Sequence, residues 1–358
     1  MLAELPGVVL YSDGYPHELQ RWALKLRLFD SLLRQQFALT DPDADPGSPL
    51  TIYLLDEGKD VERLTGRESI QGFYSPSSEG SYLIASRAPG YYKERLSGQI
   101  TLFHEYAHHF MYRHFNSAWP VWYREGFAEY ASAVSFDVDW TARVGGPNWP
   151  RLKYLDGKPM PLATILTASV EDFKPGEKAR FYAWSWKLVH LLNASPDGQQ
   201  RLQRYLRLYA GGMAPGEAAS VAFGDVDALE ARLNAYVPDP NGEQKVVLAV
   251  APLQDISVTT LDPVASRMVD LRLERIAGGN GEAALAHLRA FVAANPAHAE
   301  ARRELALALA GSELAQAKEQ ALRAISLAPG DLRSKAAWSA LEMRRVKAQP
   351  ASTAADWE

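Results

Sequence analysis

The fold and chemistry of this chain are decided at His104-Glu105-Tyr106-Ala107-His108, together with the run Trp122-Tyr123-Arg124-Glu125-Gly126-Phe127-Ala128-Glu129-Tyr130 that follows. On a helix, His104 and His108 are four residues apart and therefore lie on the same face. Two neutral imidazoles at this spacing can bind one zinc ion, which leaves Glu105 free to act on a water molecule. Glu125 supplies an oxygen ligand that completes a two-His, one-Glu site with one open position.

The surrounding residues favour two consecutive helices. Around the histidines, apolar residues recur at helical spacing, namely Leu96, Ile100, Phe103, Ala107, Phe110 and Met111. Pro120 stands at a suitable first position for a second helix, which carries Glu125 and Glu129. The alternative is a solvated helix face of His and Glu residues without a metal. Because the motif and its context agree, we expect a metal site.

At these residues the chain resembles the gluzincin metallopeptidases, the superfamily of thermolysin-like and aminopeptidase-like enzymes. In that family a helix of the type Asn-Glu-Gly-Phe-Ala follows the His-Glu-x-x-His helix and brings the third ligand. The segment 120–126 looks especially like bacterial members of the peptidase MA-like group. Arg124 replaces the usual Asn, and the sixteen residues between His108 and Glu125 are slightly fewer than in the aminopeptidases. The resemblance extends over roughly residues 5–237.

The resemblance implies roles for individual residues. His104, His108 and Glu125 would bind one Zn²⁺ per chain, and Glu105 would be the general base. Of the two carboxylates on the second helix, Glu125 is then the ligand. The other, Glu129, would accept the second ring N–H of His104.

Many gluzincins also use a Tyr or His from their helical half to stabilise the oxyanion of the transition state. Tyr182, in Phe181-Tyr182-Ala183-Trp184, is our candidate for this donor. The alternative is a core tyrosine in an aromatic-rich helix.

Composition limits the function classes. The chain has 358 residues, of which 47% are hydrophobic and 23% charged, an ordinary globular balance. The formal net charge is −5 and no basic block occurs, which argues against nucleic acid as a partner. No apolar run has the length of a membrane span, so none is expected.

The sequence gives limited information about the compartment. Residues 1–10 lack a basic segment followed by an apolar core, so no signal peptide is expected in this chain. Cysteine is absent, which fits a reducing or an oxidising compartment alike. The resemblance favours a periplasmic or secreted bacterial protein and leaves the cytoplasm open.

The pattern predicts an α+β fold. Strands are expected at 8–12, 50–55, 72–75 and 81–85, with a helix over 16–37, so that a small mixed sheet precedes the zinc helix. In gluzincins an edge strand of this sheet pairs with extended substrate, and Ser81–Ala85 is our candidate for it. The alternative is an ordinary sheet strand. Further helices are expected near 181–192, 197–210, 214–223 and 226–236.

The run Pro238-Asp239-Pro240-Asn241-Gly242 predicts a domain boundary. We therefore expect a catalytic domain at 1–240, with a sheet-containing half at about 1–135 and a helical half at about 136–237. A linker at 241–263, a helical domain at 264–346 and a flexible tail at 347–358 would follow. A strand is expected within the linker, near 245–251.

The helical domain shows a repeat of 33 residues, in the pairs Ala284/Ala317, Val292/Ile325 and Pro296/Pro329. This spacing resembles the tetratricopeptide repeat, and Ala306 falls where that repeat needs a small residue. The signature Trp-x-x-Leu-Gly is absent, and an unrelated helical bundle is the alternative.

Together these features predict a zinc-dependent peptidase, an endopeptidase rather than an exopeptidase, that acts on a peptide or protein substrate. The tetratricopeptide-like region would bind a protein partner or a substrate segment, or cap the catalytic domain. Two alternatives remain from the sequence. One is a binding scaffold with an inactive or structural metal site, and the other is a non-peptidase zinc amidase or esterase. Glu105 argues against the scaffold, because a structural site needs no base beside its ligands.

Overall fold

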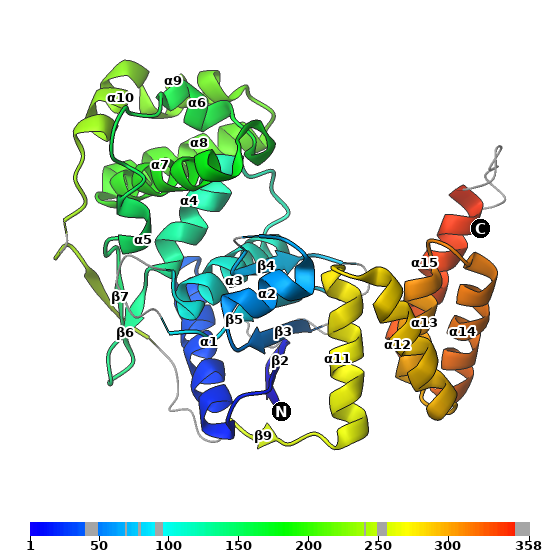
Figure 1. The fold of residues 1–358 in the computed structure, drawn as a ribbon. Helices are drawn as coiled ribbons and strands as arrows, with labels where there is room; N and C mark the ends of the chain where they lie inside the picture. The colour runs from blue at the N-terminus through cyan, green and yellow to red at the C-terminus, as the bar shows by residue number, and fades with distance from the viewer. Residues whose placement is uncertain are drawn as a thin grey trace. The chain divides into compact units, whose positions relative to one another are not determined.

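The computed structural model of this chain describes residues 1–39, 49–68, 70–77, 80–89, 96–239, 241–248 and 256–347. It mixes helices and strands, which confirms the α and β content predicted from the sequence (Figure 1). By contacts the chain divides into two compact units. Unit 1 comprises Met1–Arg21, Asp43–Ala85 and Ile256–Glu358, and unit 2 comprises Trp22–Pro42 and Ser86–Asp255.

Unit 1 contains a six-stranded sheet in the order β4-β5-β3-β2-β1-β9. Its strands are β1 (Leu2–Leu5), β2 (Val8–Ser12), β3 (Leu50–Leu55), β4 (Gly72–Ser75), β5 (Tyr82–Ser86) and β9 (Val258–Thr259). β2 and β3 pair in parallel, while β1 pairs antiparallel with β2 and with β9. Nearly every residue of β3 is buried, as expected for a central strand with both faces covered. Strands β2 to β5 match the sequence prediction, whereas β1 and β9 do not appear in it.

The prediction that Ser81–Ala85 forms a sheet edge is wrong. This segment lies in β5, which has β4 on one side and β3 on the other. The backbone N–H of Thr51 donates to the carbonyl of Ser81 at 3.0 Å, and Tyr74 of β4 pairs with Leu83. Since both sides of β5 are paired, it has no free row of backbone groups to offer a peptide. The edge strands are β4 and β9.

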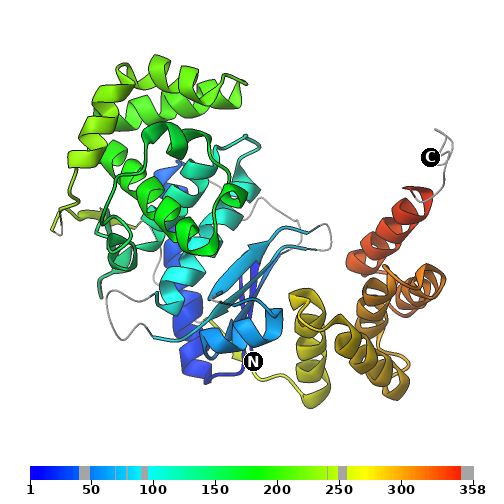
Figure 2. The same cartoon turned by 45° about the horizontal axis from the view of Figure 1, so that its top comes forward.

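Two helices pack on this sheet, α2 (Gly58–Thr65) and α11 (Pro263–Ala277). Tyr53, Val61, Ile84 and Ala277 form one buried cluster, which joins two strands to both helices. Figure 2 shows α2 and α11 side by side, in blue and yellow. An added Cβ on Gly279, just after α11, would lie 2.3 Å from the carbonyl oxygen of Leu64, so this close approach requires glycine.

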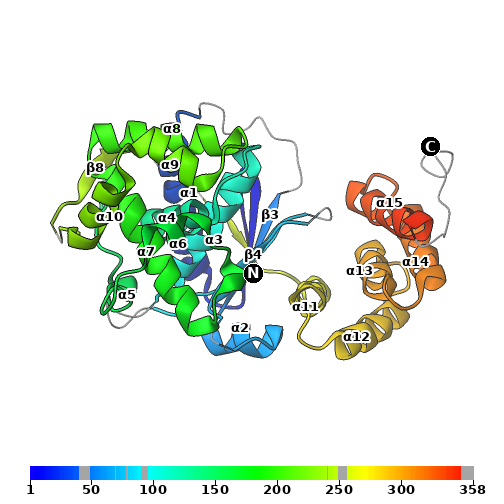
Figure 3. The same cartoon turned by 90° about the horizontal axis from the view of Figure 1, so that it is seen from above.

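The rest of unit 1 is a series of helices in which each helix from α11 to α15 packs on the next (Figure 3). They are α12 (Gly281–Ala294), α13 (Ala299–Leu309), α14 (Leu314–Leu327) and α15 (Leu332–Lys347). α14 begins 33 residues after α12, and α15 begins 33 residues after α13. The alanines at 284, 306 and 317 are buried in the core between these helices. The 33-residue repeat of the sequence therefore corresponds to a repeat of helices.

Unit 2 is mainly helical. Helix α1 (Pro16–Gln36) contributes to both units. The other helices of unit 2 are α3 (Gly98–His114), α4 (Val121–Ser132), α5 (Trp149–Leu152), α6 (Leu162–Thr167), the short 3₁₀ helix η1 (Val170–Asp172), α7 (Pro175–Asn193), α8 (Pro196–Ala210), α9 (Pro215–Phe223) and α10 (Val226–Ala235). A three-stranded sheet has the order β6-β7-β8, with β6 (Ser135–Phe136), β7 (Thr141–Val144) and β8 (Gln244–Val247). Helices α8 to α10 coincide closely with the helices predicted for 197–236, whereas α7 begins at Pro175, before the predicted start at 181.

The two compact units defined by contacts therefore differ from the domains expected from the sequence. Within the segment 241–263, which the sequence assigns to a linker, β8 pairs with β7 in unit 2 and β9 pairs with β1 in unit 1. Residues 249–255 and the expected tail after Lys347 lie outside the described residues. Among the described residues, no helix combines the length and the apolar character that a membrane crossing would require.

Candidate metal centre

Helix α3 begins where its sequence places a capping residue. The Ser97 side chain accepts a hydrogen bond from the backbone N–H of Ile100 at 3.2 Å, which satisfies one of the free donors of the first turn. The apolar face of the helix is buried, and its Phe103 stacks on Phe29 of α1 with ring centroids 4.2 Å apart. The opposite face carries His104 and His108, which are only partly buried. The amphipathic pattern thus directs the histidines away from the core.

Helix α4 brings Glu125 and Glu129 to the same place, and Gly126 controls how closely α4 approaches α7. An added Cβ on Gly126 would lie 2.5 Å from the carbonyl oxygen of Ser185 and 2.9 Å from a methyl group of Val189. Any side chain would therefore force the two helices apart. Glycine is therefore required at position 126, because the backbones of α4 and α7 approach each other closely there. Figure 1 shows these two helices next to each other.

Three potential ligand atoms converge between α3 and α4. The Nε2 atoms of His104 and His108 are 3.1 Å apart. The Oε2 atom of Glu125 lies 3.5 Å from the first and 3.4 Å from the second. These residues form a group of ligand-type side chains with the reach to hold one metal ion.

The distances between these atoms fit zinc. Zinc binds imidazole nitrogen and carboxylate oxygen at about 2.0–2.2 Å, so tetrahedral ligands lie roughly 3.3–3.5 Å from one another. The three observed separations are within about 0.2 Å of that range. All three side chains retain some exposure, between 11% and 20%. The group is therefore not fully sealed from solvent.

Glu129 lies behind His104 and sets its orientation. Its Oε1 atom is 3.2 Å from Nδ1 of His104, and its side chain is only 1% exposed. A carboxylate at this distance places the ring proton on Nδ1, which leaves the lone pair of Nε2 directed at the other ligands. This is the contact that the family resemblance implies for Glu129.

The electrostatics of the group favour a positive charge at its centre. Burial alone would lower the pKa of His104, but the carboxylates of Glu129 and Glu125 outweigh burial and raise that pKa to about 10. Burial would raise the pKa of Glu125, yet the imidazoles of His108 and His104 hold it well below its usual range. The cluster thus stabilises a bound cation, whether a proton or a metal ion.

Two residues that the sequence analysis missed complete the surroundings of Glu129. Arg151, in α5, donates to Oε1 of Glu129 at 2.5 Å, and the Asn148 amide donates to Oε2 at 2.7 Å. Burial would raise the pKa of Glu129, but Arg151 and His104 together lower it to about 2. Both new residues come from a Gly/Pro/Trp-rich segment without a recognisable motif. A buried Asn preceding a short helix is the only local signal, and it is a weak one.

Glu105 and Tyr182 lie near the ligands. Glu105 is half-buried next to His104, and its charge acts on both His104 and Tyr182. The Tyr182 ring, on α7, is 6.3 Å from the His104 ring, and the Arg151 guanidinium lies over it at 5.5 Å. Burial raises the pKa of Tyr182, and the carboxylates of Glu125 and Glu105 raise it further, so the phenol stays protonated and can donate.

The structure therefore brings together all six residues that the sequence analysis selected, from α3, α4 and α7. In comparisons with known proteins, the sequence matches no family model and no curated protein. The interpretation of the site accordingly depends on its own geometry and chemistry.

Proposed function

We propose that this protein is a zinc-dependent peptidase with its active site on α3, α4 and α7. The observation that carries the proposal is the convergence of two imidazole nitrogens and one carboxylate oxygen at 3.1–3.5 Å, next to a half-buried carboxylate. A purely structural zinc site uses four protein ligands and needs no neighbouring base. Three ligands beside Glu105 instead favour hydrolysis.

Each residue has a distinct role in this proposal. His104, His108 and Glu125 would hold the ion, and Glu129 with Arg151 keeps His104 in one tautomer and orientation. Zinc at this position supplies Lewis acidity toward a peptide carbonyl and lowers the pKa of a water to about 7. Glu105 accepts the proton of the attacking water and returns it to the departing amine.

Tyr182 is proposed as the donor to the developing oxyanion. Its phenol is protonated, it lies beside His104, and its helix is held by the close contact at Gly126. A donor on a packed helix needs little rearrangement when charge develops on the substrate.

The finer description of the fold is also part of the proposal. A sheet before the metal helix and a helical half after it support a gluzincin-type catalytic region. The 33-residue spacing of α12 with α14, and of α13 with α15, supports a tetratricopeptide-like array. Such arrays commonly present a surface to a protein partner, and we propose this role for α11 to α15.

Metal content tests the proposal directly. Purified protein should contain one zinc per chain by elemental analysis, and His108→Ala should lose it. His114→Ala is the matched control, since it removes an imidazole from the same helix outside the ligand group, and it should retain zinc. Absence of zinc from the wild type, or equal zinc in both variants, would falsify the metal assignment.

Activity tests the reaction. Glu105→Gln keeps the size of the side chain but cannot accept the proton, so it should retain zinc and lose turnover by at least ~10²-fold. Cleavage-site mass spectrometry on a digested proteome would reveal peptide-bond hydrolysis and show whether the cuts are internal. If only small ester or amide substrates are hydrolysed, the enzyme is a zinc hydrolase of another class.

A further inference from the structure

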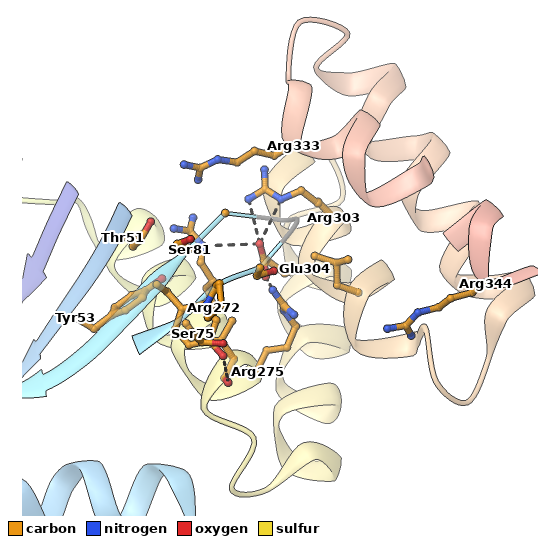
Figure 4. Close-up of a pocket in the computed structure, with 16 residues that line it drawn as sticks. Thr51, Tyr53, Ser75, Ser81, Arg272, Arg275, Arg303, Glu304, Arg333 and Arg344 are labelled. Atoms are coloured by element: carbon orange, nitrogen blue, oxygen red, sulfur yellow. Dashed lines mark hydrogen bonds and ion pairs between the residues drawn. The ribbon is translucent and has the colours of Figure 1, made fainter. Parts of the chain in front are cut away.

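Unit 1 contains a cavity of about 470 Å³ between its sheet and its helical array. Five arginines line it: Arg272 and Arg275 from α11, Arg303 from α13, and Arg333 and Arg344 from α15 (Figure 4). Glu304 is the one carboxylate among the residues lining the cavity. The volume suits a small molecule, because ligand pockets typically measure about 300–1,000 Å³.

Three of the five arginines form hydrogen bonds or ion pairs with carboxylates of the chain. Arg275 donates to Glu304 at 2.7 Å, and Arg303 donates to the other oxygen of Glu304 at 3.1 Å. Arg303 also reaches Asp331 at 2.9 Å, and Arg272 forms an ion pair with Glu300. These contacts hold α11 and α13 together and account for the buried Glu304.

The remaining two arginines, Arg333 and Arg344, form no ion pair that would hold the described part of the fold together. Arg333 is half-buried, and its guanidinium makes no ion pair or hydrogen bond within the described part of the chain. Burial lowers the pKa of Arg333, and the positive charges of Arg272 and Arg303 lower it further. Arg344 is exposed and likewise lacks an ion pair among the residues described. Among the residues that the structure describes, these two guanidinium groups therefore line the cavity without an ion pair.

A second observation points to a ligand. The guanidinium of Arg272 pairs with Glu300 and interacts with Tyr53, but its Nε–H is buried and has no hydrogen-bond partner in the part of the chain that the structure describes. An oxygen of Glu304 lies 3.8 Å from this nitrogen, too far for a hydrogen bond. A buried charged donor left unsatisfied is costly, and an acceptor entering the cavity would remove that cost. From the sheet side, Thr51, Ser75 and Ser81 add hydroxyl groups to the lining.

We propose that this cavity binds a small, multiply charged oxyanion, a ligand with adjacent phosphate or carboxylate groups. The arginine fork matches the paired oxygens of both groups, and several forks around one cavity favour a ligand with more than one negative charge. The size of the cavity and its arginines on three helices favour a small molecule over an extended acidic chain. This site is independent of the proposed peptidase activity.

The test uses the full-length protein with two probes, pyrophosphate and citrate, measured by isothermal titration calorimetry at low ionic strength. Binding at one site per chain is expected for at least one probe, with sodium chloride of equal ionic strength as the blank. Tighter binding of pyrophosphate identifies phosphate as the preferred group, and tighter binding of citrate identifies carboxylate. Failure of both probes to bind above the blank overturns the proposal.

Variants locate the site. Arg333→Ala should weaken binding by about 10-fold or more, since a hydrogen-bonded charge is lost. Arg323→Ala is the matched control: it removes the same charge from α14 of the same array, where Arg323 pairs with Glu319, and should bind as the wild type does. Equal weakening in both variants would show only a general effect of surface charge.

Folding is checked separately. Thermal melts without ligand should be similar for both variants, because Arg333 makes no ion pair among the described residues and the pair of Arg323 with Glu319 is exposed. If Arg333→Ala is nevertheless unstable, the exposed Arg344→Ala serves as the second variant and should also weaken binding. Wild-type affinity in Arg344→Ala and in the charge-preserving, fork-removing Arg333→Lys would reject the site.

Discussion

Glu129 in unit 2 and Glu304 in unit 1 are both buried carboxylates that contact cations. Their surroundings differ, because the groups near Glu129 favour a further cation and those near Glu304 favour an anion. The first is 1% exposed and the second 2%. Burial would raise the pKa of each, yet neighbouring cations lower both to about 2. Arg151 and His104 do this for Glu129, whereas Arg275, Arg303 and Arg272 do it for Glu304.

The difference lies in the charge that remains unmatched around each carboxylate. Glu129 holds a histidine whose other nitrogen faces a second histidine and Glu125, so lone pairs converge and a cation is needed. Around Glu304 the guanidinium groups outnumber the acids, and Arg333 remains without an ion pair among the described residues. A buried carboxylate alone therefore does not identify a binding site, whereas the balance of positive and negative charge among its neighbours does.

The largest effect is expected from Glu304→Gln. Removing the negative charge takes a shared carboxylate away from the buried Arg303 and the half-buried Arg272 and Arg275. Breaking such a buried network typically costs about 3–5 kcal/mol in the free energy of unfolding. Chemical denaturation at neutral pH, followed by circular dichroism, measures it. Glu319→Gln on α14 is the control, because its exposed pair with Arg323 contributes less than about 1 kcal/mol.

The same variant has a pH dependence and a second readout. Because the pKa of Glu304 in the folded chain lies below its ordinary value of 4.5, its contribution is fully present above pH 4.5 and disappears as the pH falls toward 2. The stability difference between wild type and variant should therefore shrink over that range. Pyrophosphate or citrate should bind the variant more tightly, since a competing carboxylate is gone. Weaker binding would mean that Glu304 orders the arginines for the ligand.

The two sites also differ in how far the sequence predicts them. The proximity of His104, His108 and Glu125 was predictable because they lie on two consecutive helices, and helical geometry fixes which residues share a face. His104 and His108 are separated by one turn, and Glu125 follows on the next helix. Asn148 and Arg151 escaped prediction because they reach Glu129 from a loop and a short helix without periodicity.

The arginine cavity was not predictable because its residues are distant in the sequence. Thr51 and Ser81 come from the sheet, whereas Arg272, Arg303 and Arg333 come from three helices of the array. The pairing of β1 with β9 and the packing of α11 on the sheet are contacts of the same long range. Local patterns cannot encode such contacts, and for the same reason the interior place of β5 was missed.

The next largest effect is expected from Tyr182→Phe, which removes a phenol beside the candidate metal centre. Loss of one oxyanion donor costs about 2.7–4 kcal/mol in comparable hydrolytic sites, or roughly 10²–10³-fold in kcat. KM and zinc content should change little, because the phenol acts on the transition state rather than on the ground state. Steady-state kinetics beside zinc analysis measures all three quantities.

The control for Tyr182 separates catalysis from packing. Tyr209→Phe removes a phenol from α8, and it should leave turnover unchanged. If Tyr182→Phe lowers the melting temperature while kcat remains that of the wild type, then Tyr182 is a core residue and the donor must be sought elsewhere.

The smallest effect is expected from Glu129→Ala. Its size relative to that of Glu125→Ala tests which carboxylate of α4 binds the metal and which one orients His104. Glu125 faces both imidazole Nε2 atoms, so its removal should abolish tight zinc binding. Among the three potential ligands, Glu129 contacts His104, at Nδ1 rather than at the Nε2 that faces the group. Its removal frees the tautomer and orientation of that ring without removing a ligand, an effect that typically weakens metal affinity by about 10–100-fold.

Glu129→Ala also leaves Arg151 buried without its carboxylate, so a loss of stability could imitate a loss of affinity. The double variant Glu129→Ala with Arg151→Met removes both charges and separates the two effects, because it should recover stability but not zinc affinity. Competition with a chelator of known affinity, beside melts of the zinc-free proteins, provides the comparison. If Glu129→Ala loses zinc more completely than Glu125→Ala does, the ligand assignment on α4 is reversed, and His104 is held by Glu125 instead.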